Sequence, residues 1–176
     1  MHRNSYLWNV NSSTHLFIMA MEKEIKTVRM IMLVMGIILA FSNTLGLLIN
    51  IVIIRDLPSQ GIEFLDFILD NFALICLVFF VSGVLSIIAS LMLKNRKEIS
   101  RIFAMFTAVL SFIIVLGFSV FMMTLFPFDE MNKVPEMEGL PVIFGVFMLF
   151  GALSNASPAI VVLYYLNKSS VKELFT

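Results

Sequence analysis

Four long apolar runs, separated by short polar segments, constrain this chain more than any other feature. They cover residues 28–54, 72–93, 102–126 and 140–166, and away from their ends they contain no Asp, Glu, Lys, Arg or His. At about 1.5 Å per residue, each run is long enough as a helix to cross a hydrocarbon core about 30 Å thick. Because 60% of the residues are hydrophobic and only 14% are charged, a soluble surface is excluded. The sequence therefore predicts an all-α fold, a bundle of four transmembrane helices.

The two ends of the chain are polar. Residues 1–27 carry both histidines and many hydroxyl and amide side chains, and we expect them to form a loose cytoplasmic N-terminus. Met19 or Met21 is an alternative start, because charged residues lead from there directly into the first span. Residues 167–176 are expected to form a short cytoplasmic tail.

The first loop, between the first and second runs, combines acidic and apolar residues. Glu63, Asp66 and Asp70 recur at helical spacing, with apolar side chains on the other side. This pattern predicts a short amphipathic interfacial helix in that loop. The helix either stands alone or continues without a break into the second span.

A basic link joins the second and third runs and determines the topology. Burying a Lys or Arg side chain in hydrocarbon costs about 2.5–3.5 kcal/mol, so the link must lie in water. Ten of the twelve Lys and Arg residues lie in the N-terminal segment, in this link or in the tail, whereas the two other loops are mainly acidic. The positive-inside rule then predicts a multi-pass protein of a cytoplasmic membrane with both termini in the cytoplasm. The topology determinants in the link are Lys94, Arg96, Lys97 and Arg101.

Small residues predict where the second and third spans pack. A short link makes these two helices antiparallel neighbours, and small side chains at a spacing of three or four residues let helices approach closely. We expect one packing seam between the two spans. It would be formed by Ser82, Ser86, Ser90, Ala104, Ala108 and Ser111.

Polar side chains inside the spans form a candidate intramembrane site. Asn43 and Asn50 lie on nearly one face of the first span, and Ser154, Asn155 and Ser157 precede Pro158 in the fourth. One interpretation is structural: the asparagines bond to neighbouring helices, and the polar cluster satisfies the carbonyl of Ser154, which Pro158 leaves without its usual donor. The other is a polar pathway, or a site where a broken helix binds an ion or small solute.

The sequence carries no sign of enzyme chemistry. It has no Gly-rich phosphate loop, nucleophile elbow or Cys-x-x-Cys pair, and its one cysteine, Cys76, lies in an apolar run. His2 and His15 have no partner at metal-ligand spacing, so we expect no zinc or haem site. We also expect no other cofactor and no nucleic-acid partner. The charge-free spans also argue against a coupled pump.

The order of parts resembles that of the small four-span membrane proteins of bacteria with no assigned function. This resemblance covers the whole chain and rests on organisation, not on a motif. The order also resembles claudins, but the first outer segment lacks the Trp and paired Cys of that family, and no claudin role is carried over.

The sequence favours a non-enzymatic accessory, structural or interaction protein. Its partners would be the lipid bilayer and either another membrane protein or further copies of itself. Two alternatives remain open: an oligomeric pore or facilitator for a small solute or ion, and an immunity factor against a membrane-active peptide.

Overall fold

The computed structural model describes residues 5–54, 63–126 and 140–175, and these residues confirm an all-α fold. Four helices in this part of the chain are long and apolar enough to cross a membrane, as in a multi-pass integral membrane protein. The elements in chain order are α1 (Ser5–Val52), α2 (Glu63–Met92), η2 (Leu93–Asn95), α3 (Glu98–Leu125), α5 (Leu140–Asn167), α6 (Ser169–Lys172) and η4 (Glu173–Phe175).

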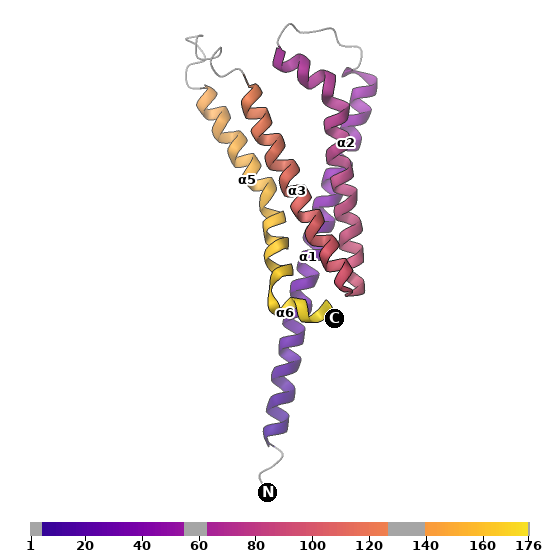
Figure 1. Cartoon of the computed structure of the whole chain (residues 1–176), viewed down its shortest axis with the longest axis vertical. Coiled ribbons are helices and arrows are strands. Elements are labelled where there is room, and N and C mark those ends of the chain that lie inside the picture. The colour runs from indigo at the N-terminus through magenta and orange to yellow at the C-terminus, as the bar shows by residue number, and fades with distance from the viewer. Residues whose placement is uncertain (1–4, 55–62, 127–139, 176) are drawn as a thin grey trace.

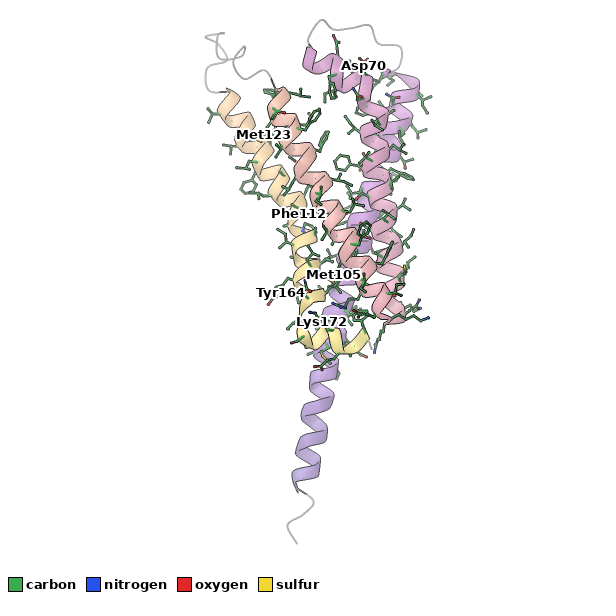
Figure 2. The ribbon with its side chains drawn as sticks, in the orientation of Figure 1. Asp70, Met105, Phe112, Met123, Tyr164 and Lys172 are labelled. Carbon is green, nitrogen blue, oxygen red and sulfur yellow. The ribbon has the colours of Figure 1, made fainter. Side chains whose placement is uncertain are left out.

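The four long helices alternate in direction, up and down (Figure 1). The connection between α2 and α3, residues 93–97, therefore lies at the same end of the bundle as the C-terminal segment, residues 168–175. We call this the basal end, and the opposite one the far end. Figure 2 shows Lys172 at the basal end and Asp70 near the far end.

The bundle is built from two pairs of helices, α1 with α2 and α3 with α5, which make the most extensive contacts. The first pair is held very close by glycine. A Cβ atom added at Gly36 would lie 2.7 Å from the carbonyl oxygen of Gly83, and one added at Gly83 would lie 2.6 Å from the amide nitrogen of Ala40. The two pairs converge at the basal end and diverge towards the far end (Figure 1).

The predicted seam between the second and third spans is only partly correct. Ser82 and Ser111 do meet across α2 and α3, with their hydroxyl oxygens 2.9 Å apart. Ser90, however, donates a hydrogen bond to the carbonyl of Arg29 in α1 (2.8 Å), and Ser86 donates to Ser82 in its own helix. The small residues of α2 therefore contact both α1 and α3, and α2 approaches α1 more closely.

The apolar core lies at the basal end. Val28 of α1, Leu93, Ala104 of α3 and Leu166 of α5 are all completely buried there. Ala108 belongs to the same cluster.

The C-terminal segment closes this core from below. Val171 and Phe175 are about 1% exposed and belong to the same cluster. Residues 169–175 form α6 and η4 beneath the bundle, so the predicted short tail is part of the fold (Figure 1). The reason is that Val171 and Phe175, four residues apart, present their side chains together to the point where the helices converge.

The N-terminal segment also differs from the loose chain that we predicted. From Ser5 it is helical and continuous with the first span, so α1 is 48 residues long and extends well beyond the basal end (Figure 1). Met21, Ile25, Val28 and Met32 follow one another at spacings of four, three and four residues, and all are buried. Ile25, Val28 and Met32 belong to the basal core cluster, and their burial holds the charged segment between Met21 and Val28 in a helix.

The amphipathic segment after the first loop forms the first turns of α2 and is not a separate helix. In Figure 1 these turns run obliquely before α2 descends. Phe67 packs edge-on against Phe121 of α3, with ring centroids 5.3 Å apart. This aromatic contact joins the two helix pairs near the far end. Residues 55–62, before α2, and residues 127–139, between α3 and α5, lie outside the described residues.

Candidate functional site

A cavity of about 350 Å³ lies between the two helix pairs and is lined by all four long helices. It exists because the pairs share a core at the basal end and separate above it. The side chains that line it from α1 and α2 are Ile31, Met32, Met35, Leu39, Phe79 and Ser86; those from α3 and α5 are Ala108, Ser111, Val115, Phe118, Ser119, Met122, Met148, Gly151, Ala152, Asn155, Pro158, Ala159 and Val162.

The lining is apolar and soft. Among the described residues around the cavity none is charged, whereas four are methionine, whose unbranched thioether adapts to irregular shapes. The polar members are three serines and Asn155. A lining of this kind suits an uncharged, mainly apolar ligand, because a charged group would lose its hydration without gaining a partner.

Polar side chains in the lining already donate hydrogen bonds to backbone carbonyls of the protein. Ser86 donates to the carbonyl of Ser82 (3.0 Å) and Ser119 to that of Val115 (2.8 Å). The amide nitrogen of Asn155 donates to the carbonyl of Gly151 (2.8 Å). The cavity therefore offers few donors, and an apolar occupant would leave these hydroxyl protons paired.

Only one of the five residues of the predicted intramembrane polar site lines the cavity, namely Asn155. Asn43 donates to the carbonyl of Leu39 in its own helix (2.8 Å), and neither it nor Asn50 is among the lining residues. Ser154 and Ser157 are also not among them, and both are exposed on α5. The structure does not gather the five residues into one site.

The residues around Pro158 behave as the structural interpretation predicts. The hydroxyl of Ser157 donates to the carbonyl of Ser154 at 2.8 Å, which replaces the backbone hydrogen bond that Pro158 cannot make. Helix α5 continues through the proline. The polar cluster thus supplies a hydrogen bond within its own helix in place of the one that the proline removes.

The cavity is closed at the basal end. Below Met32, Ala108 and Val162 lies the buried cluster that contains Val28 and Leu166. This cluster blocks a path through a single copy of the chain. The cavity therefore ends above this cluster, but it is not enclosed along its sides, because Asn155 in its lining is exposed.

Reciprocal polar contacts lock the α1–α2 pair at the basal end. Arg29 donates from Nε to the carbonyl of Ser90 (3.2 Å), while Ser90 donates to the carbonyl of Arg29.

Two ion pairs tie α1 to other segments: Glu22 with Arg96 (2.8 Å) and Glu24 with Lys168. The hydrogen bond from Lys168 to Glu24 raises the pKa of the lysine.

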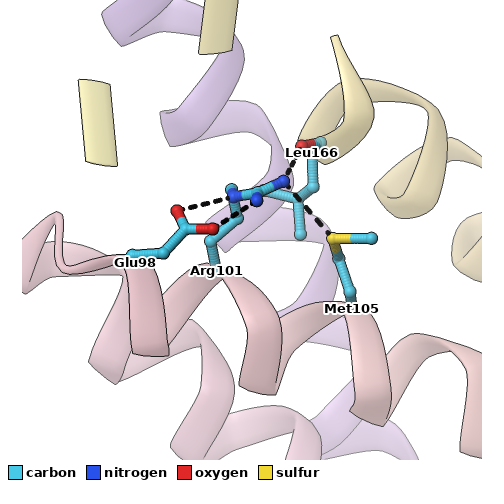
Figure 3. A network of polar contacts seen from close by, with 4 residues as sticks. All are labelled: Glu98, Arg101, Met105 and Leu166. Atoms are coloured by element: carbon cyan, nitrogen blue, oxygen red, sulfur yellow. Dashed lines mark hydrogen bonds and ion pairs between the residues drawn. The ribbon is translucent and has the colours of Figure 1, made fainter. Parts of the chain in front are cut away.

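The predicted topology determinants have two different environments. Lys94 and Lys97 are exposed, whereas Arg96 and Arg101 make specific contacts. Arg101 pairs with Glu98, donates to the carbonyl of Leu166 at the end of α5 (3.1 Å), and approaches the sulfur of Met105 (Figure 3). This arginine therefore joins the start of α3 to the end of α5.

Sequence reasoning did not single out the methionines of the cavity, Met32, Met35, Met122 and Met148. Met residues are frequent throughout the apolar runs, and nothing in one run shows that its methionines face those of another. In the described part of the chain there is no group of three or more His, Cys, Asp or Glu side chains that could hold a metal ion.

Comparison with known proteins found no matching family model, no matching curated protein and no matching solved structure.

Proposed function

We propose that this chain is a non-enzymatic interaction protein of a membrane, which works by holding another membrane component in the cavity between its helix pairs. The observation that carries this proposal is the cavity itself, about 350 Å³ in volume and lined by all four long helices. Its size falls within the range of about 300–1,000 Å³ that is typical of ligand sites.

The apolar lining, contributed by all four long helices, supports an occupant that is itself apolar. In a bilayer, where water is absent from the core, an apolar component is the natural occupant.

The lining supports a binding role rather than catalysis. General acid–base and nucleophilic catalysis need titratable or activated side chains near the substrate. Among the described residues around the cavity there is no His, Cys, Asp, Glu or Lys, and the serines donate to backbone carbonyls or to each other.

We further propose that the basal end faces the cytoplasm of a cytoplasmic membrane. The support is the concentration of Lys and Arg in the segments at that end, as the positive-inside rule requires. In a Cys76→Ala background, Lys97→Cys should react with an impermeant thiol reagent only after the cells are permeabilised. Ser59→Cys, in the first loop and outside the described residues, should react in intact cells. Labelling of Lys97→Cys in intact cells would reverse the orientation.

The binding role is tested by native mass spectrometry of the full chain released from detergent or nanodiscs. We expect a population that carries additional mass after extensive washing. The added mass distinguishes a small amphiphile from a protein partner. A chain that always appears without added mass would argue against the proposal.

A further inference from the structure

From the shape of the cavity we infer that its occupant is a single unbranched hydrocarbon chain, which enters from the far end and stops above the basal core. This inference rests on the proposed function and names the ligand of the same site. The chemical class is a long-chain amphiphile with an uncharged tail, whether a membrane lipid or a free fatty acid.

The cavity is long and narrow. Its lining extends from Met122 to Ala108 in α3 and from Met148 to Val162 in α5, which at about 1.5 Å per residue is about 21 Å in each helix. A helix with side chains is about 10 Å across, so a stretch of helix about 21 Å long needs far more room than a cavity of this volume encloses. An extended hydrocarbon chain is much thinner and does fit.

The length of the cavity limits the length of chain that fits. The occupied part of an extended chain is at most about 21 Å long, the distance over which α3 and α5 line the cavity. Such a chain is stabilised by each methylene that moves out of water. From lipid the gain is smaller and comes from close contact with the wall.

The two ends of the cavity are different, and this sets the direction of the chain. At the basal end Val28, Ala104 and Leu166 are completely buried, which leaves no room for a polar head group. Towards the far end the helix pairs diverge, and Met122 lies three residues before the end of α3 (Figure 1). The tail therefore points to the basal end, and the head group lies at the far end.

The wall chemistry agrees with a hydrocarbon chain. The methionines give a flexible surface that follows a chain in several conformations. The amide nitrogen of Asn155, halfway along α5, donates a hydrogen bond to the carbonyl of Gly151. The hydroxyls of Ser86 and Ser119 also donate to backbone carbonyls. An apolar chain can pass these groups without breaking a hydrogen bond.

Two glycines of α5 provide a matched pair of variants. Gly151 lines the cavity and Gly145 does not, and a Cβ atom at either position would meet nothing within 4 Å. Gly151→Phe therefore fills the cavity, whereas Gly145→Phe adds the same ring to the same helix elsewhere. Both variants are expected to fold.

The test uses the full chain in phosphatidylglycerol vesicles that contain a trace of phospholipid with a diazirine at the end of one acyl chain. After irradiation, peptide mass spectrometry should find the label at Met32, Ala108 or Val162, around the basal end of the cavity. Gly151→Phe should reduce this labelling by about tenfold, as expected for a site whose occupant loses its space, and Gly145→Phe should leave it unchanged. A second arm uses a free fatty acid with the same diazirine chain.

The outcomes separate the two claims. Labelling by the phospholipid assigns the chain to a membrane lipid, and labelling by the fatty acid alone assigns it to a free amphiphile; either supports the inference. Label confined to outward-facing residues such as Phe147 and Phe150 would overturn it. If that happened while Gly151→Phe still removed a bound mass in native mass spectrometry, the ligand class would be wrong and the binding role would stand. If no bound mass were found either, both would fail.

Discussion

Phe175→Ala should lower the free energy of unfolding by about 3–5 kcal/mol, the largest effect expected of any single substitution in this chain. The ring of Phe175 is about 1% exposed and lies in the core with Val28, Leu93 and Leu166. Truncation would leave a hole at the point where all four long helices converge. The measurement is the midpoint of unfolding in mixed micelles with increasing denaturing detergent, followed by circular dichroism.

Phe150→Ala is the matched control for this prediction. Phe150 is 73% exposed on α5 and faces away from the bundle, so its truncation should change the stability by less than about 0.5 kcal/mol. Equal midpoints for Phe175→Ala and wild type would mean that the C-terminal segment does not close the core.

Gly36→Ala should destabilise the protein by about 1–3 kcal/mol. The added Cβ atom would lie 2.7 Å from the carbonyl oxygen of Gly83 and 2.9 Å from the amide nitrogen of Ile87. Both are backbone atoms, so α1 and α2 must move apart, which also strains the hydrogen bonds between Arg29 and Ser90. The same unfolding assay measures the loss.

Gly145→Ala gives the opposite sign and serves as the control. An added Cβ atom at Gly145 would meet nothing within 4 Å, and alanine is favoured over glycine within a helix by about 0.5–1 kcal/mol. We expect a small gain in stability for this variant. A Gly36→Ala protein as stable as Gly145→Ala would contradict the close packing of α1 and α2.

The sequence predicted the parts that depend on one element at a time. A charge-free apolar run that is long enough, as a helix, to cross the bilayer is expected to span it. Where a short link joins two such helices, they must be antiparallel neighbours. The hydrogen bond from Ser157 to the carbonyl of Ser154 was also predictable from one element, since donor, acceptor and proline lie within five residues.

The parts that depend on two elements were not predictable. The stripe Ser82, Ser86 and Ser90 shows that a helix can come close, but not which one, and Gly36 and Gly83 decide in favour of α1. The helical N-terminal segment and the folded C-terminal segment likewise need partners that no local pattern names.

The cavity is harder still to predict, because it is a space between elements. It arises where two well-packed pairs diverge above a shared core. Asn155 was found by its polarity, but the methionines opposite it carry no signal in a sequence with thirteen Met residues. This explains why polar residues were a poor guide to a site with an apolar wall.

If the cavity between the helix pairs holds another membrane component, native mass spectrometry of three proteins side by side will show it. Wild type and Gly145→Phe should carry the same added mass, and Gly151→Phe should carry none. Equal added mass on Gly151→Phe and wild type would contradict this proposal, because a component that stays bound when Gly151 carries a phenyl ring does not lie in this cavity.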